Sequence, residues 1–271
     1  MTVYFLGGGN MAEAIIAGLR RARPDLPVHV ADRGEEKRRR LAQQYRVAVS
    51  EKLPVLTSDD VLVLAVKPQD MQTACAGVET GGALVLSVAA GLSTATLSRY
   101  LNGHTRIIRV MPNTPSKIGL GVSGLFAPEY IGQTDRDTAE MLMRPAGMTI
   151  WLDDENRMHR ITGISGSGSA YVFYLLDALA AAAREQGFSA QDARSLSLAT
   201  FKGAVALAEA QTEDFAVLQQ QVTSKGGTTA EAIKVFEARN IAGSIVQGVA
   251  ACVRRSEEIA AEFEKTPSEA V

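Results

Sequence analysis

The sequence has little cysteine and histidine, and it lacks long apolar runs. Its two cysteines, Cys75 and Cys252, lie far apart, and its three histidines form no recognisable metal cluster. Scarce cysteine argues against a disulfide framework and fits a reducing compartment. No stretch reaches the ~18 consecutive apolar residues of a membrane span, and the N-terminus lacks the basic segment of a secretory signal. We therefore expect a cytoplasmic protein with no metal centre and no membrane contact.

The chain also lacks an excess of charge of either sign. It has 28 basic and 30 acidic residues, for a net charge of −2, so no nucleic-acid-binding surface is expected. The one basic cluster, residues 37–40 (KRRR), follows two glutamates. It is interpreted either as a solvated helix face or as an attraction for a phosphate group. A length of 271 residues with 46% hydrophobic and 21% charged residues is typical of a globular protein and allows two domains.

What the sequence does contain is a glycine fingerprint at its start. An apolar segment at 3–6 precedes residues 7–12 (GGGNMA), which fit Gly-x-Gly-x-x-Ala and lead into a helical pattern. Gly7 permits the tight bend, Gly9 leaves room for a pyrophosphate at the helix N-terminus, and Ala12 allows close packing. A second strand ends before Asp32 and Arg33, about 20 residues beyond the fingerprint, where the adenosine ribose is expected. This context favours a dinucleotide site over an ordinary glycine-rich turn.

Strand and helix patterns alternate through residues 1–152. The apolar run at 61–66 is typical of a central parallel strand, and further strands are expected at 28–31, 47–49, 84–88, 106–110, 121–125 and 149–152. This rhythm predicts an α/β, Rossmann-like domain with a doubly wound, mostly parallel sheet. Residues 153–271 show helical patterns, and the one at 189–210 is apolar on most of its circumference. We therefore expect an all-α dimerisation domain at 153–271, covered by a second chain, rather than a compact monomeric bundle.

The loops after the strands are candidates for the coenzyme site, because ligands of a doubly wound sheet lie outside the carboxyl ends of its strands. These loops are 67–69 (KPQ), 89–91 (AAG) and 111–115 (MPNTP). Lys67 directly follows a buried strand, and we favour contact with a coenzyme phosphate or ribose over a solvated side chain. Pro112 and Pro115 restrict the residues between them. A rigid turn that presents the Asn113 amide suits the nicotinamide end, although a plain connecting turn has the same spacing.

Two glycine- and hydroxyl-rich segments precede helical patterns in the C-terminal part. They are residues 163–170 (GISGSGSA) and 223–229 (TSKGGTT). Free N–H groups and hydroxyls at a helix N-terminus bind a carboxylate by the physics that applies to a phosphate. Ordinary capping is the alternative, but capping requires one hydroxyl, whereas Ser224, Thr228 and Thr229 surround a Gly-Gly pair.

Six segments in this order resemble the pyrroline-5-carboxylate reductase family. They are 7–12 (GGGNMA), 65–68 (AVKP), 88–91 (VAAG), 109–115 (RVMPNTP), 163–168 (GISGSG) and 226–229 (GGTT). The resemblance implies reduction of the cyclic imine Δ1-pyrroline-5-carboxylate to L-proline with NAD(P)H, the last step of proline biosynthesis. It also implies homodimers that interlock through the helical domain and often assemble into decamers. Ser169 and Lys225 stand where the family usually has proline.

The resemblance also implies roles for individual residues. The loop that ends at Thr229 holds the substrate carboxylate, and Thr229, the expected catalytic residue, contacts the ring nitrogen. The expected substrate-binding residues are Ser165, Ser224, Gly226, Gly227, Thr228 and Thr229. Together with the strand-end loops, the expected coenzyme-binding residues are Gly7, Gly9, Asn10, Met11, Asp32, Arg33, Ala65, Val66, Lys67, Pro68, Ala89, Ala90, Met111, Pro112 and Asn113.

Two other functions fit parts of the pattern. A β-hydroxyacid dehydrogenase shares the architecture but needs a lysine as acid–base where this chain has Val172. A non-catalytic NAD(P)-binding regulator would not need the hydroxyls of the substrate loop. As for the coenzyme, Asp32 favours NADH because a carboxylate repels a 2′-phosphate, whereas Arg33 attracts that phosphate. With Lys37 and Arg38 nearby, we expect NADPH, with NADH tolerated.

Overall fold

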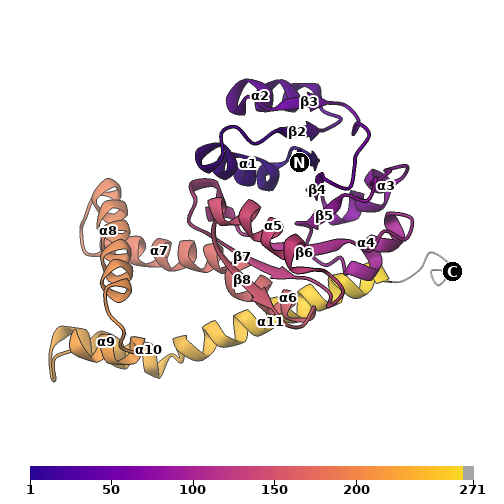
Figure 1. The fold of residues 1–271 in the computed structure, drawn as a ribbon. Coiled ribbons are helices and arrows are strands. Elements are labelled where there is room, and N and C mark those ends of the chain that lie inside the picture. Colours follow the sequence, from indigo (N-terminus) through magenta and orange to yellow (C-terminus); the bar gives the residue numbers. More distant parts are fainter. Residues whose placement is uncertain (265–271) are drawn as a thin grey trace. The chain divides into compact units, whose positions relative to one another are not determined.

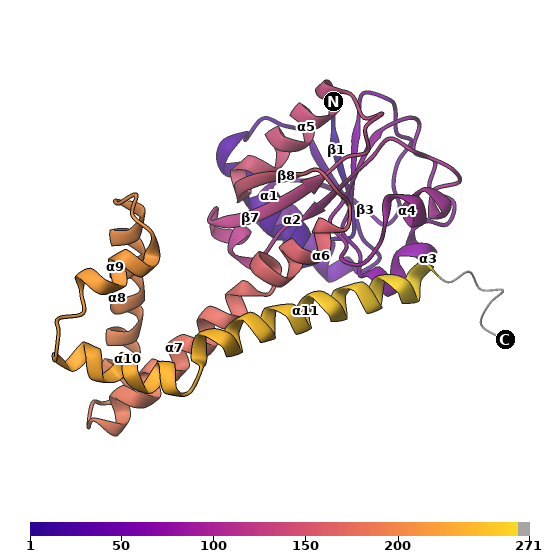
Figure 2. The same cartoon turned by 90° about the horizontal axis from the view of Figure 1, so that it is seen from below.

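The computed structural model describes residues 1–264, which fall into two compact units (Figures 1 and 2). Unit 1 comprises Met1–Ser167 and the chain from Ala251 onward, and unit 2 comprises Gly168–Ala250. This division differs from the boundary after residue 152 predicted above, because the helical segment up to Ser167 and the end of the last helix pack with the sheet. Residues 265–271, the end of the predicted second domain, lie outside the described residues.

Unit 1 is built on one eight-stranded sheet. Its strands are β1 (Val3–Leu6), β2 (Val28–Ala31), β3 (Ala48–Ser50), β4 (Val61–Leu64), β5 (Leu84–Ser87), β6 (Ile107–Met111), β7 (Gly121–Phe126) and β8 (Gly147–Leu152). Their order is β3-β2-β1-β4-β5-β6-β7-β8, and every neighbouring pair is parallel except β6 with β7. The order changes direction between β1 and β4, which is the switch point of the predicted doubly wound sheet.

Helices cover both faces of this sheet. They are α1 (Asn10–Ala22), α2 (Glu35–Tyr45), α3 (Met71–Cys75), α4 (Thr94–Tyr100), α5 (Gln133–Met143), α6 (Arg157–Ile161) and the end of α11 (Ile241–Glu264), with short turns η1 (Pro68–Asp70), η2 (Thr114–Ile118), η3 (Arg144–Ala146) and η4 (Thr162–Gly166). Val3 and Phe5 pack in one apolar cluster with α1, α2 and α5. Leu62 and Leu64 pack in a second cluster with α3, α4 and Phe263 of α11. Burial on both faces explains the continuous apolar sequence of β4.

Unit 2 is all-helical and leaves most of its apolar side chains uncovered. It contains α7 (Gly168–Glu185), α8 (Ala190–Glu209), α9 (Phe215–Gln221), α10 (Thr228–Ala238) and the first part of α11. The apolar helix predicted at 189–210 is α8, and its exposed side chains include Leu196, Leu198, Val205 and Leu207. Apolar surface on this scale indicates a protein partner. Among residues 1–264, no helix is long and apolar enough to cross a bilayer.

Candidate active site

The predicted coenzyme loops lie along one edge of the sheet of unit 1. β1, β2, β4, β5 and β6 run parallel to one another, so their carboxyl ends share that edge. The residues at or directly after these ends are Gly7, Asp32, Ala65, Val88 and Met111. The structure therefore brings together strand-end loops that are far apart in sequence, on both sides of the switch point between β1 and β4.

The glycine loop leaves an open, uncapped helix N-terminus. Gly7 has a φ of +95°, and a Cβ there would lie 2.9 Å from the carbonyl oxygen of Ala65. Gly9 precedes α1 without a side-chain cap, and the first helical bond runs from the Glu13 N–H to the Gly9 carbonyl. The N–H groups of the first turn are therefore free of intrahelical partners. A Cβ on Gly9 would meet nothing closer than the Ala65 oxygen at 4.0 Å, so this backbone fits a pyrophosphate.

Asp32 stabilises the glycine loop through hydrogen bonds. Its Oδ2 accepts from the Gly8 N–H at 2.8 Å and lies 2.9 Å from Lys37 Nζ, while its Oδ1 accepts from the Gly34 N–H at 2.8 Å. Burial alone would raise the pKa of Asp32, but these hydrogen bonds outweigh burial and hold its pKa below the ordinary value. The ion pair with Lys37 offsets the charge of the carboxylate and weakens its repulsion of a 2′-phosphate.

The basic cluster at residues 37–40 is divided between separate partners. Arg38 donates to the carbonyl oxygens of Asp32 and Arg33 at 2.6 and 3.0 Å. Arg40 pairs with the buried Glu13 of α1 at 2.8 Å. Arg33 is itself exposed at the turn after β2. The cluster is thus not a uniformly solvated helix face, and Arg33 is the guanidinium at this turn that is open to a ligand.

The loops after β4 and β5 are short and closely packed. Val66 and Ala65 lie against Gly7, while Lys67 is exposed at the start of η1. Ala89 is buried, and Gly91 follows with a φ of +76°. A Cβ on Gly91 would lie 3.2 Å from Ile259 of α11. The last turns of α11 therefore pack on the loop after β5, a contact that the sequence patterns did not predict.

Asn113 connects β7 and η4 through two side-chain hydrogen bonds. Its Oδ1 accepts from the Val122 N–H of β7 at 2.8 Å, and its Nδ2 donates to the Ser165 carbonyl at 3.1 Å. Both ends of this amide are thus engaged within unit 1, and its contact with a nicotinamide stays a prediction. Ser165 lies in η4, a π-helical turn, and such turns are frequent at functional sites.

An ion pair that the sequence patterns did not predict links β6 to the segment between β8 and α6. Arg109 of β6 lies 3.0 Å from Glu155, and its side chain is only 5% exposed. Glu155 also accepts from the N–H and the hydroxyl of Thr94, at 2.7 and 3.0 Å. Burial lowers the pKa of Arg109, and Glu155 opposes that shift. An arginine inside an apolar strand was the available signal, because a buried charge needs a partner.

In unit 2, the start of α10 resembles the start of α1 in its chemistry. Gly226 has a φ of +73°, and Gly227 precedes the helix without a side-chain cap. A Cβ on Gly227 would displace Ser224 Oγ from its present position, whereas the positive φ of Gly226 is what favours glycine in this turn. Within residues 1–264, the hydroxyls of Ser224, Thr228 and Thr229 have no hydrogen-bond partner. An uncapped N-terminus with free hydroxyls can receive a carboxylate.

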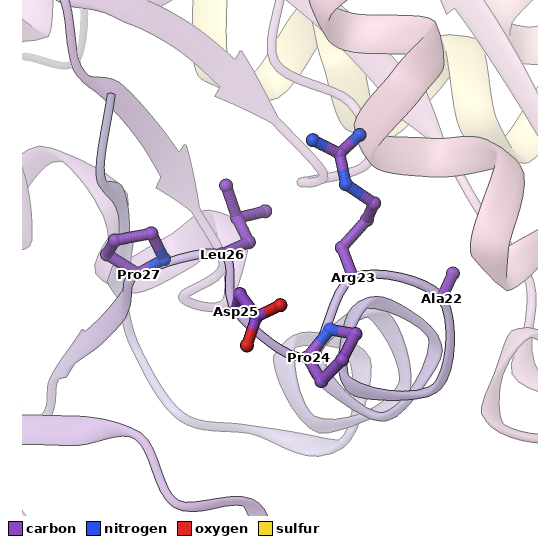
Figure 3. A pocket seen from close by; sticks show the side chains of 6 residues that line it. All are labelled: Ala22, Arg23, Pro24, Asp25, Leu26 and Pro27. Atoms are coloured by element: carbon purple, nitrogen blue, oxygen red, sulfur yellow. The ribbon is translucent and has the colours of Figure 1, made fainter.

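Two surface hollows of unit 1 lie away from these loops. One, of about 420 Å³, is lined by residues 22–27, where α1 ends and the chain turns into β2 (Figure 3). The other, of about 550 Å³, is lined by the end of α1 together with Asp137, Glu140 and Arg144. Because both include the start of the connection to β2, they lie toward the amino ends of the strands, opposite the coenzyme loops.

Comparison with known proteins gives consistent matches over nearly the whole chain. Residues 155–259 match the family model for pyrroline-5-carboxylate reductase dimerisation, and residues 2–91 match the model for coenzyme F420-dependent NADP oxidoreductase. The pyrroline-5-carboxylate reductase of Haemophilus influenzae is 39% identical over 95% of this chain and 97% of its own. That of Pseudomonas aeruginosa is 36% identical over 95% and 96%. A solved pyrroline-5-carboxylate reductase structure from Coxiella burnetii has a TM-score of 0.86 at 36% identity, covering 95% of this chain and 98% of its own.

Proposed function

This chain belongs to the pyrroline-5-carboxylate reductase family, NAD(P)H-dependent oxidoreductases that convert Δ1-pyrroline-5-carboxylate to L-proline, and we propose which of its residues carry that reaction. The observation that supports the assignment of residues is the pair of uncapped, glycine-preceded helix N-termini at α1 and α10. Each supplies free N–H groups to an anion. The first suits the coenzyme pyrophosphate, and the second suits the substrate carboxylate.

NADPH is the proposed coenzyme, with NADH tolerated. Gly9, Asn10 and Met11 at the start of α1 would hold the pyrophosphate, and NADPH supplies the hydride when bound. Arg33, exposed beyond β2, would bind the 2′-phosphate, since a guanidinium pairs well with phosphate oxygens. Asp32 is already occupied by backbone N–H groups and Lys37. Its charge is therefore a smaller obstacle to NADPH than the sequence alone indicates.

The remaining coenzyme contacts are assigned by position along the edge of the sheet. The loops after β4, β5 and β6 lie on the far side of the switch point from Asp32. They would therefore line the nicotinamide half, because a dinucleotide extends across the switch point. The residues proposed there are Ala65, Val66, Lys67, Pro68, Ala89, Ala90, Met111, Pro112 and Asn113.

The substrate is proposed to bind through the loop before α10. The N–H groups of Gly227, Thr228 and Thr229, with the Ser224 hydroxyl, would receive the carboxylate, and Ser165 would contribute from the η4 turn. Thr229 would hydrogen-bond the ring nitrogen and orient it. A protonated imine is already electrophilic, so the chain has chiefly to position the ring, with solvent or a bound water as the proton source. Hydride transfer requires the imine carbon about 3–3.5 Å from the nicotinamide C4.

The chain forms homo-oligomers through its dimerisation region. The exposed apolar side chains of unit 2, Phe173, Val205 and Phe236 among them, supply the surface for a second copy. We propose an interlocked dimer as the basic assembly and a decamer as the final one. Light scattering coupled to size exclusion measures this directly. A mass of ten chains supports the decamer, a mass of two chains leaves only the dimer, and a monomer contradicts both. The two free thiols accord with the cytoplasm as the proposed location.

Steady-state kinetics with purified protein tests the proposed function. We expect the absorbance of NADPH to fall only when pyrroline-5-carboxylate is present, with L-proline as the product. The kcat/KM should be higher with NADPH than with NADH. Coenzyme binding without turnover would instead support a non-catalytic regulator. Turnover of a 3-hydroxy acid would support the β-hydroxyacid dehydrogenase alternative, although the expected acid–base position is Val172, an exposed residue of α7.

A further inference from the structure

Glu155 joins three separate parts of unit 1. It lies between β8 and α6. Its Oε1 accepts from the Thr94 N–H at 2.7 Å and from Arg109 Nη1 at 3.0 Å, and its Oε2 accepts from the Thr94 hydroxyl at 3.0 Å. One carboxylate thereby fixes the start of α4 and the middle of β6 to the segment that leaves the sheet. The partners are 61 and 46 residues away in sequence.

Both partners of Glu155 belong to segments that carry proposed coenzyme contacts. Thr94 is the first residue of α4, directly after the loop that contains Ala89 and Ala90, and Arg109 stands two residues before Met111 at the end of β6. A movement of either segment would therefore shift a loop on the nicotinamide side of the edge. The hydrogen bond from Asn113 to Ser165 already holds the loop after β6 against η4. The main effect of Glu155 is therefore on the position of the loop after β5 relative to the loop after β6.

Stability alone is a weak reason for such a pair. Replacing a buried ion pair with apolar residues of similar volume is often neutral or stabilising, because removing two charges from water is costly. The Arg109 side chain is 5% exposed and that of Glu155 is 26% exposed. Within residues 1–264, Arg109 Nε has no hydrogen-bond partner. The residues on either side of Arg109 in β6 are apolar, and an aliphatic side chain would continue that sequence more simply than this arginine.

We propose that Glu155 is a positioning residue for hydride transfer, which holds the loops after β5 and β6 in the relative placement that aligns the nicotinamide. This inference rests on the proposed function for its chemistry. Its structural part is the coupling of the two loops through one carboxylate, and this coupling does not depend on which substrate the protein reduces.

The test compares Glu155→Gln with a matched surface control, Asp153→Asn. Asp153 lies two residues away and pairs with Arg157 at 2.8 Å, but its side chain is 77% exposed. Glu155→Gln should lower kcat about 10- to 100-fold, the scale of a misplacement of about 1 Å. Its Kd for NADP⁺ should stay within about threefold, because the pyrophosphate and ribose contacts lie elsewhere. The kinetic isotope effect with 4-deuterated NADPH should rise as the hydride step becomes rate-limiting. Asp153→Asn should match the wild type in all three measurements.

Hydrogen exchange of the coenzyme-free protein gives a readout without turnover. Glu155→Gln should speed amide exchange in residues 89–94 and 109–113, and Asp153→Asn should not. If the single variant folds poorly, Arg109→Met combined with Glu155→Gln removes the unpaired charge and should restore the melting temperature, while kcat stays low. Recovery of wild-type kcat and isotope effect in that double variant would overturn the proposal, as would unchanged exchange in both loops. Lack of wild-type turnover would instead refute the proposed function and leave the exchange result informative.

Discussion

Substituting alanine at Gly7 and at Gly9 should separate the stability of the glycine loop from its coenzyme binding. Gly7 has a φ of +95°, and a Cβ there would lie 2.8 Å from Val66 Cγ1 and 2.9 Å from the Ala65 carbonyl oxygen. A left-handed conformation costs an L-residue about 1–2 kcal/mol, and the contact with backbone adds to it. We expect a loss of about 3 kcal/mol in the free energy of unfolding, or roughly 5–10 °C in Tm.

Gly9→Ala should behave in the opposite way. Its Cβ would enter open space, with the Ala65 oxygen at 4.0 Å as the nearest atom, and its φ of −74° suits any residue. The free energy of unfolding should change by less than about 1 kcal/mol, since the poorer N-cap is offset by reduced freedom of the unfolded chain. The methyl group would stand where the pyrophosphate approaches. The Kd for NADPH should therefore rise at least tenfold, or about 1.4 kcal/mol.

Differential scanning fluorimetry and titration of NADPH fluorescence measure the two effects on the same samples. The expected pattern is a low Tm for Gly7→Ala and weak coenzyme binding at near-normal Tm for Gly9→Ala. Wild-type NADPH affinity in Gly9→Ala would refute the placement of the pyrophosphate above this residue. A wild-type Tm in Gly7→Ala would refute the steric argument for the turn.

Four further outcomes follow from the same structure. Arg33→Ala should raise KM for NADPH about 10- to 100-fold, the value of a hydrogen bond to a charged group, and leave KM for NADH nearly unchanged; equal effects would refute its phosphate role. Thr229→Val should lower kcat about 3- to 10-fold, as for one neutral hydrogen bond, and Thr229→Ser should restore it; full activity in the valine variant would remove Thr229 from the site. Burial lowers the pKa of His159, and the charge of Arg109 lowers it further. The stability that the neutral imidazole contributes is therefore complete above about pH 6.5 and is lost as pH falls through the lowered pKa. His159→Gln should remove this pH dependence of thermal stability, which amounts to at most about 1.4 kcal/mol per pH unit, and an unchanged slope of stability against pH would contradict this. Val205→Glu, at a side chain 55% exposed on α8, should yield smaller assemblies in light scattering, whereas Val55→Glu, 85% exposed in unit 1, should not; intact assemblies in both would show that α8 is not an interface.

The fold of unit 1 was largely predictable because its elements are defined by local patterns. Alternating apolar segments located all eight strands, and β2 at 28–31 has the predicted bounds. The run at 61–66 proved two residues longer than β4, because Ala65 and Val66 turn out of the strand to pack against Gly7. Patterns of this kind report burial, and they do not report where a strand bends into a loop.

The boundary between the two units and the long-range hydrogen bonds of Glu155 and Asn113 were harder to predict from the sequence. The change of pattern after residue 152 is real, but the helical segment up to Ser167 packs with the sheet. That packing depends on contacts distant in sequence, such as Glu155 with Thr94 and Arg109. The sequence pointed to Asn113 through its flanking prolines, yet the hydrogen bonds of this residue to Val122 and Ser165 could be found only once β7 and η4 were placed.

A crystal structure of the protein with NADP⁺ and L-proline measures the proposed active site directly. The proline carboxylate should accept hydrogen bonds from the N–H groups at the start of α10, and the pyrophosphate should lie on those at the start of α1. The proline Cδ, which receives the hydride, should lie about 3–3.5 Å from the nicotinamide C4. A proline ring bound away from α10, or with Cδ well outside that distance from C4, would contradict the assignment of these two helix N-termini.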